Sequence, residues 1–305
     1  MEQTVTAHYA AIDWGMENFR LWLVSWEGQI VAERFSEDGA GSVAPSGFGT
    51  VLEKHLENLS VSASLPVLIC GAAGSRIGWR EAPCLSVPAR LSEIADHTVR
   101  LDGYSRDVRF VAGIARDEPD MADIMRGEEA KLIGSHSGTD TLYLACLPGT
   151  HSKWVQVDEG RITRFSTFMT GEMFSVLRQH STLKRAIEGA DEVQPDSADF
   201  EHGVKSGYSN PEEFTSHLFS VYAAQLFHHI RPQQSLDRLS GLLIGCEIGG
   251  ARVRFGQTEN LRLIAGPPLV SAYEAALSIL KLPSVSVDAD SAVVNGLKSI
   301  ADRIW

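Results

Sequence analysis

The sequence predicts an α/β protein with two similar lobes that face a central cleft. A strand–turn–strand pattern with glycine in its turn occurs at residues 9–24 and again at 141–157, and helical patterns follow each copy. With 305 residues, the chain is long enough for two domains of ordinary size. We therefore place an N-terminal lobe at residues 1–115 and a C-terminal lobe at residues 116–305.

The N-terminal lobe begins with two predicted strands, at residues 9–13 and 20–24, which form a hairpin. Gly15 and Asn18 lie in the turn between them, and both residue types accept turn conformations readily. The elements expected next along the chain are a helix at 51–59, a strand at 66–71, a strand at 109–115, a linker at 116–126 and a helix at 126–134.

The C-terminal lobe is predicted to contain a second three-stranded unit followed mainly by helices. Its expected elements are strands at 141–149, 153–157, 161–167 and 261–266, and helices at 173–183, 214–230, 241–253, 270–280 and 291–304. The apolar residues expected near one face of the helix at 214–230 are Leu218, Phe219, Tyr222, Leu226 and Ile230. Gly249 and Gly250 are expected to break the helix that begins at residue 241.

Charge and cysteine usage exclude some classes of function. The formal net charge of -12 argues against nucleic acid or an anionic membrane as the main partner, because both require a basic patch. The four cysteines lack the spacing of a zinc site or a disulfide framework, which fits a reducing compartment. The N-terminus lacks the charged and apolar regions of a signal peptide, and no apolar run reaches the ~18–20 residues that span a bilayer. We therefore expect a cytoplasmic location.

Two glycine turns carry groups suited to a polyphosphate. Asp13 ends a strand just before Gly15, and one carboxylate is enough for Mg²⁺, which keeps several of its waters. Alternatively, Asp13 is an ordinary turn residue. In the second turn, at 148–153, Gly149 allows close approach of the backbone, and successive N–H groups can form an anion nest. Lys153 either adds charge there or points to solvent, and a lone histidine such as His151 is more often structural.

Three further segments have both a functional and a structural interpretation. The glutamates of Arg126-Gly127-Glu128-Glu129 either favour the start of a helix or accept a hydroxyl proton. The loop at 71–83 combines glycines, arginines and a tryptophan, which suit a sugar acid, or it is an ordinary glycine-rich loop. Small residues at 242–250 and 264–269 either approach an adenine ring or allow close helix packing. The chain has no GxxxxGK[ST] motif, and residues 39–41 are interpreted as a loop.

These segments together resemble the 2-keto-3-deoxygalactonate kinases, of the acetate and sugar kinase, heat-shock chaperone and actin superfamily. The resemblance is carried, in order, by AIDWG…NFRLWL, GAAGSRIGWREAPCLSVPA, IMRGEEAKLIG, LPGTHSKWV, FMTGEMFSVL, LSGLLIGCEIGGA and LIAGPPLVSAYEAAL. It implies two ribonuclease H-like lobes, the actin-like ATPase fold, with ATP and a sugar acid in the cleft. The implied enzyme transfers the γ-phosphate of ATP to 2-dehydro-3-deoxy-D-galactonate, giving the 6-phosphate, in galactonate degradation.

The resemblance also implies roles for individual residues. Asp13 is expected to organise Mg²⁺, and Glu128 or Glu129 is expected to be the general base. The residues expected at ATP and its phosphates are Gly15, Asn18, Arg20, Gly149, Thr150, His151, Ser152, Lys153, Gly245, Gly249 and Gly266. The residues expected at the sugar acid are Gly74, Ser75, Arg76, Gly78 and Trp79.

The first turn departs from the family pattern, which usually has hydroxyl residues after the glycine of DWG. Here Met16 and Glu17 occupy those positions, and Cys84 stands where an aromatic residue is common. One alternative is therefore a nucleotide- or sugar-acid-binding sensor that has lost transfer activity. Another is a kinase for a related acid such as 2-dehydro-3-deoxygluconate. The expected partners are the two small molecules, without nucleic acid or membrane, and a homodimer is left open.

Overall fold

The computed structural model describes residues 6–256 and 260–305. They form two compact units. The first unit comprises the described residues up to Asp140, Glu159–Arg164 and Ala289–Trp305, and the second comprises Thr141–Asp158 and the described residues of Phe165–Asp288. The boundary at residue 115 that we placed from sequence lies inside the first unit.

The first unit is built on a mixed sheet. Its strands are β1 (Tyr9–Trp14), β2 (Phe19–Val24), β3 (Ile30–Ser36), β4 (Val67–Gly71), β7 (Val99–Arg100) and β8 (Val108–Phe110), in the order β3-β2-β1-β4-β8-β7. The central strand β1 pairs antiparallel with β2 and parallel with β4, and β4 pairs parallel with β8. The large aromatic side chains of Trp14, Phe19, Phe48 and Phe110 fill the core beside this sheet.

Helices cover this sheet. They are α1 (Phe48–Glu57), α2 (Glu128–Ser135), α9 (Ala289–Ile304) and the short 3₁₀ helices η1 (Ala72–Gly74) and η2 (Leu91–His97). Helices α2 and α9 pack backbone to backbone, because a Cβ at Gly134 would lie 1.9 Å from the carbonyl oxygen of Ala292. A Cβ at Gly296 would likewise lie 1.8 Å from the Ala130 carbonyl, so the close contact with α9 extends to the first turn of α2, where the RGEE motif lies.

The second unit repeats the topology of the first. Its strands are β11 (Tyr143–Leu147), β12 (Ser152–Asp158), β13 (Arg161–Phe168), β14 (Leu261–Ala265) and β15 (Ser284–Asp288), in the order β15-β14-β11-β12-β13. As in the first unit, the first strand pairs antiparallel with the second and parallel with the next strand beyond the hairpin. This shared order is that of a ribonuclease H-like sheet, so the predicted α/β class with two such lobes is confirmed.

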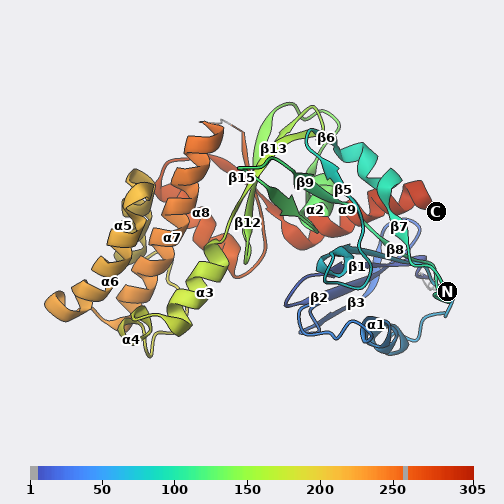
Figure 1. The fold of residues 1–305 in the computed structure, drawn as a ribbon, viewed down its shortest axis with the longest axis horizontal. Coiled ribbons are helices and arrows are strands. Elements are labelled where there is room, and N and C mark those ends of the chain that lie inside the picture. The colour runs from blue at the N-terminus through green and yellow to red at the C-terminus, as the bar shows by residue number, and fades with distance from the viewer. Residues whose placement is uncertain (1–5, 257–259) are drawn as a thin grey trace, which may run out of the picture. The chain divides into compact units, whose positions relative to one another are not determined.

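The helices of the second unit are α3 (Thr170–His180), α4 (Leu183–Ala186), α5 (Ala198–Ser209), α6 (Phe214–His228), α7 (Pro232–Phe255) and α8 (Leu269–Ile279), with the 3₁₀ helix η3 (Pro211–Glu213). Helices α5, α6 and α7 lie side by side (Figure 1). Within the described ranges, no helix combines the length and apolar character needed to cross a bilayer.

Two predictions in the first unit were wrong. The segment 109–115 is two strands, β8 and β9 (Gly113–Arg116), in different sheets. The chain changes sheets there, because the Val111 N–H bonds to Ile69 and the Gly113 N–H bonds to Pro83. The expected linker at 116–126 contains β10 (Asp123–Met125), which forms a three-stranded sheet with β9 and β5 (Cys84–Ser86). The short strand β6 (Ala89–Arg90) pairs with the start of β13.

Two helical predictions in the second unit were also wrong. Helix α7 continues through Gly249 and Gly250 to Phe255, because neighbouring side chains and backbone occupy the space beside these glycines. Only part of the proposed apolar face of α6 is packed. Leu218 and Tyr222 pack against the core, whereas Phe219 and Leu226 are 65% and 54% exposed, and Val221 is the buried residue of this helix.

Candidate active site

In the first unit, the turn between β1 and β2 is held by backbone hydrogen bonds. The Gly15 N–H donates to the carbonyl of Asn18 at 2.9 Å and closes the turn. A second segment, residues 39–41, supports the turn from outside: the Ala40 N–H donates to the Gly15 carbonyl and the Gly41 N–H donates to the Met16 carbonyl, both at 2.9 Å. The segment interpreted from sequence as a loop thus fixes the conformation of the first turn.

Charged side chains gather beside this turn. The Asp13 carboxylate lies 3.5 Å from the ammonium of Lys131, which belongs to α2. Burial lowers the pKa of Lys131, but the charges of Asp13 and Glu128 outweigh it, so the net shift is upward and the ammonium stays charged. Arg20 forms an ion pair with Asp290 at the start of α9. Lys131 and Asp290 were missed from sequence, because only the packing of α2 and α9 brings them to the turn.

The two glutamates of the RGEE motif have different surroundings. Glu129 is fully buried, and both of its carboxyl oxygens accept from the Gly127 N–H at 2.8 Å. Burial, with a further contribution from the charge of Glu128, raises the pKa of Glu129 to about 8. Glu128 is only partly buried. A Cβ on Gly127 would lie 3.5 Å from an Asp13 carboxyl oxygen, so the RGEE and DWG motifs meet in this unit.

The glycine-rich loop after β4 is compact and anchored by an aromatic cluster. Trp79 is half-buried against Trp14, Phe48, Tyr104 and Phe110, with ring centroids 5.3–6.3 Å apart. A Cβ at Gly78 would come within 2.4 Å of the Ala73 carbonyl, so only glycine fits there. Arg76 is exposed, and the loop's Ser75 and Gly74 precede it. Trp79 therefore anchors the loop to the aromatic core, and its contact with the sugar acid stays a prediction.

Arg126 links this loop to the RGEE motif. Its guanidinium donates to the Ala82 carbonyl at 2.6 Å and to the Cys84 sulfur at 3.2 Å. Burial raises the pKa of the Cys84 thiol, so the group that replaces the family's usual aromatic residue is a neutral thiol.

In the second unit, the loop between β11 and β12 exposes some of its predicted phosphate ligands and buries others. Thr150 and His151 are exposed, and Gly149 is partly exposed. Ser152 and Lys153 are buried, at 0% and 5% exposure. The Lys153 ammonium donates to the His151 carbonyl at 3.0 Å. Its side chain therefore does not point to solvent, and it stabilises the loop through the His151 carbonyl.

The N-terminal end of α3 supports the same loop. The Glu172 N–H donates to the Thr150 carbonyl at 3.0 Å, and the Glu172 carboxylate lies 2.5 Å from His151 Nε2. A Cβ at Gly171 would lie 2.5 Å from the Gly149 carbonyl, so this helix can approach only through a glycine. The FMTGEM motif thus holds the loop between β11 and β12 in place.

A buried acid lies behind the loop. Glu247, on α7, accepts from Trp154 Nε1 at 2.8 Å and from the Tyr273 hydroxyl at 2.7 Å. The Tyr273 hydroxyl is also 3.1 Å from the Ser152 hydroxyl. We did not identify Glu247 and Tyr273 as functional from sequence, although an acid within the apolar run LLIGCEIGG is a signal that a partner network exists.

Two of the three glycines predicted at adenosine have packing roles. A Cβ at Gly245 would lie 2.3 Å from the Val204 carbonyl, and one at Gly249 would lie 3.0 Å from the Tyr208 carbonyl. Both glycines therefore let α7 pack closely on α5. The Gly266 carbonyl accepts from the Leu269 N–H at 3.1 Å at the start of α8. Their contact with adenosine stays a prediction.

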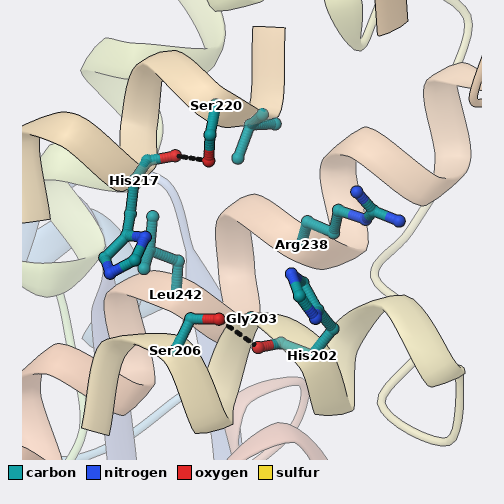
Figure 2. Close-up of a pocket in the computed structure, with 8 residues that line it drawn as sticks. His202, Gly203, Ser206, His217, Ser220, Arg238 and Leu242 are labelled. Atoms are coloured by element: carbon teal, nitrogen blue, oxygen red, sulfur yellow. Dashed lines mark hydrogen bonds between the residues drawn. The ribbon is translucent and has the colours of Figure 1, made fainter. Parts of the chain in front are cut away.

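A small pocket lies between α5, α6 and α7 (Figure 2). Its volume is about 30 Å³, and its polar side chains include those of His202, Ser206, His217 and Arg238. This volume suits one or two waters and is far below that of a sugar acid. None of the residues predicted from sequence lines this pocket.

The comparisons with known proteins agree along nearly the whole chain. A family model described as 2-keto-3-deoxy-galactonokinase matches residues 13–300. A Rhizobium meliloti (strain 1021) protein named "Probable 2-dehydro-3-deoxygalactonokinase DgoK1" is 42% identical over 304 residues, covering 99% of each chain. The 2-dehydro-3-deoxygalactonokinase of Escherichia coli (strain K12) is 33% identical over 302 residues, covering 98% of this chain and 99% of the relative.

A solved structure supports the same assignment. The crystal structure of a Sinorhizobium meliloti protein assigned as a 2-dehydro-3-deoxygalactonokinase superposes with a TM-score of 0.92 at 41% identity, covering 97% of this chain and 99% of the other. The resemblance seen in the motifs is confirmed, and the chain belongs to the 2-keto-3-deoxy-galactonokinase family.

Proposed function

We propose that this chain transfers the γ-phosphate of ATP to the terminal hydroxyl of 2-dehydro-3-deoxy-D-galactonate, giving the 6-phosphate. The observation that carries the proposal is the meeting of the DWG turn with the RGEE helix start, where Gly127 lies against Gly71 and Asp13. The carboxylate of Asp13, the acid of Glu128 and the partly buried ammonium of Lys131 are thereby gathered at one place in the first unit. Phosphoryl transfer needs these groups, because its catalysis is mostly positioning and charge stabilisation.

Asp13 suits the Mg²⁺ of MgATP. Mg²⁺ is held in proteins by one or two carboxylates, with waters and phosphate oxygens completing its shell, and when bound it neutralises charge on the phosphates. Asp13 supplies the carboxylate, and its side chain is 13% exposed. The Lys131 ammonium, 3.5 Å away, is a cation within reach of a phosphate oxygen bound there. Arg20 offers a second cation to the phosphates.

Glu128 is the better candidate for the general base. A base must be ionised near neutral pH and must reach the substrate hydroxyl. Glu129 meets neither condition, because it is fully buried, both oxygens accept from Gly127, and its pKa is raised to about 8. Its role is to hold the start of α2. Glu128 precedes it on the same helix turn and is partly exposed beside Asp13 and Lys131.

The loop at 74–79 is the proposed sugar-acid site. Arg76 is exposed at its tip, and a guanidinium can bind a carboxylate through two parallel hydrogen bonds. Gly78 and the aromatic cluster around Trp79 hold the loop in a single conformation. Arg126 connects this loop to the start of α2, so substrate binding and base placement depend on one structural unit.

A coupled assay against a panel of acceptors tests the proposal. The panel contains 2-dehydro-3-deoxygalactonate, its gluconate epimer and the matching sugars without a carboxylate, each with MgATP. We expect ADP release and a 6-phosphate product with the galactonate compound, weaker transfer to the epimer and none to the uncharged sugars. Faster transfer to the epimer would reassign the substrate, and absence of transfer to every acid would refute the kinase assignment.

A further inference from the structure

Glu247 is a carboxylate buried in the core of the second unit. It lies at the middle of α7 and is 2% exposed. Burying a carboxylate is costly unless hydrogen bonds replace its water. Glu247 meets this condition, because the side chains of Trp154, Tyr273, Thr170 and Ser152 hydrogen-bond to it. A leucine would fill the volume without this cost, so an acceptor at this position needs an explanation.

The hydrogen bonds around Glu247 form a chain that reaches the loop between β11 and β12. An indole N–H only donates, so the carboxyl oxygen that faces Trp154 accepts. The Tyr273 hydroxyl donates to the other carboxyl oxygen at 2.7 Å, and it lies 3.1 Å from the Ser152 hydroxyl. The Ser152 oxygen in turn accepts from the Gly149 N–H at 3.4 Å. Glu247 is thus connected through Tyr273 and Ser152 to the backbone of this loop.

The same carboxylate also reaches the helix that supports this loop. Thr170, the first residue of α3, hydrogen-bonds to Glu247. Two residues later, the Glu172 N–H holds the Thr150 carbonyl at 3.0 Å. Hydrogen bonds therefore hold the loop at two points, at Gly149 through Ser152 and at Thr150 through α3. Both sets of hydrogen bonds lead to Glu247.

We propose that Glu247 is a positioning residue for nucleotide binding, which holds residues 149–151 so that the backbone N–H groups of Thr150 and His151 face the phosphates of ATP. This inference rests on the proposed function only for the identity of the ligand, a nucleoside triphosphate. Changes to Glu247 should weaken nucleotide binding and leave sugar-acid binding unchanged, because the groups held through Glu247 belong to the loop at 149–152 of the second unit.

The test measures binding of Mg²⁺ with a nonhydrolysable ATP analogue by calorimetry, alongside KM for both substrates. One variant is Glu247→Gln, which keeps the shape of the side chain but places an amide NH₂ donor beside the donors of Trp154 and Tyr273. The other is Tyr273→Phe, which removes the hydroxyl between Glu247 and Ser152. The matched controls are Glu201→Gln and Tyr222→Phe, on α5 and α6 away from the network. We expect each network variant to weaken analogue binding about tenfold, about 1.4 kcal/mol, with the KM for the sugar acid unchanged within about twofold.

Rescue and coupling separate positioning from general stability. Glu247→Asp keeps the acceptor and should recover part of the lost affinity. Ser152→Ala combined with Glu247→Gln should bind the analogue no more weakly than Glu247→Gln alone, because both changes break one chain. The melting temperature identifies any variant that does not fold. In that case the analogue affinity of Tyr273→Phe, which removes only a hydroxyl, decides the test.

The outcomes distinguish this inference from the proposed function. Analogue affinity within twofold of the unmodified protein in folded Tyr273→Phe and Glu247→Gln would overturn the inference, as would equal losses for both substrates. Weakened analogue binding by these variants supports it even if no sugar acid in the panel accepts phosphate, because calorimetry needs no turnover.

Discussion

The turn after β1 and the loop after β11 occupy equivalent places in two sheets of the same strand order, yet they are built differently. The first turn is surrounded by ionised side chains, those of Asp13, Lys131 and Arg20. In the second loop Thr150 and His151 are exposed and the side chains of Ser152 and Lys153 are buried. One turn therefore contributes charge and the other contributes geometry.

This difference predicts how each region responds to mutation. Replacing a charged group of the first turn removes a chemical function while leaving the backbone hydrogen bonds of the turn in place. Replacing a buried group of the second loop leaves the chemistry intact and shifts the N–H groups. We thus expect losses of kcat from changes in the first region and losses of nucleotide affinity from changes in the second.

The largest expected effect is that of Asp13→Asn. The amide keeps the volume but loses the charge that holds Mg²⁺, so kcat should fall by at least about 100-fold, equivalent to about 2.7 kcal/mol. Steady-state kinetics at saturating MgATP measure this, and Asp102→Asn, an exposed acid of the same unit, is the control. Retention of more than about a tenth of the unmodified kcat would remove Asp13 from the metal role.

The next effect separates the two glutamates of RGEE. Glu128→Gln should lower kcat by about 100-fold, the lower range for loss of a general base. Glu129→Gln should keep most of the activity, because an amide oxygen still accepts from the Gly127 N–H. Single-turnover rates of the two variants, compared at pH 7, measure this. The reverse order of effects would make Glu129 the base.

Glu129 should also give the protein a pH-dependent stability. Its pKa is about 8 when folded, against an ordinary value of 4.5, so between these values the folded protein keeps a proton that the unfolded chain releases. The free energy of unfolding therefore falls as pH rises from about 5 to 8, by up to about 1.4 kcal/mol per pH unit from this group. Thermal unfolding across this range should show a flatter profile for Glu129→Gln. Parallel profiles for the two proteins would contradict the buried, protonated carboxyl.

The sequence was sufficient for the features that rest on local patterns. Both hairpins were predicted, because alternating apolar residues flank a glycine turn in each, and two of the quoted motifs, DWG and RGEE, meet beside Asp13. The pairing of β5, β9 and β10 was not predicted, because short strands far apart in the sequence carry little local signal. Helix α7 was wrongly ended at Gly249, because glycine weakens a helix by itself but allows the close contact with α5 that stabilises it.

The site was predicted less completely than the fold. Lys131 and Asp290 reach Asp13 and Arg20 only through the packing of α2 on α9, which no sequence pattern indicated. Ser152 and Lys153 were expected at the phosphates, and the structure buries both side chains, so their contact with phosphate stays a prediction. A motif thus indicates the region of a site, while burial shows which of its side chains reach outward.

A smaller effect is expected in the sugar-acid loop. Arg76→Ala should raise the KM for the sugar acid about tenfold and leave the KM for ATP unchanged, because an exposed guanidinium is lost without any packing change. Trp79→Ala should also lower the melting temperature, since its ring packs on four aromatic side chains. Trp79→Phe is the control that keeps an aromatic ring. An effect of Arg76→Ala confined to ATP would move this loop to the nucleotide side.

The smallest expected effect concerns Met16 and Glu17, the departure from the family pattern in the first turn. Both side chains are exposed, and the turn is held through backbone atoms of Gly15 and Met16, so Met16→Thr with Glu17→Ser should leave its conformation unchanged. The double variant removes a charge of the same sign as the triphosphate and adds two hydroxyl donors. We expect kcat/KM for ATP to rise about two- to fivefold, and to rise less at high salt, because exposed charges are screened.

An unmodified protein without transfer activity, together with an active double variant, would instead favour a sensor. We expect the unmodified chain to be active, because Glu17 points to solvent and Asp13, Lys131 and the second loop keep their contacts.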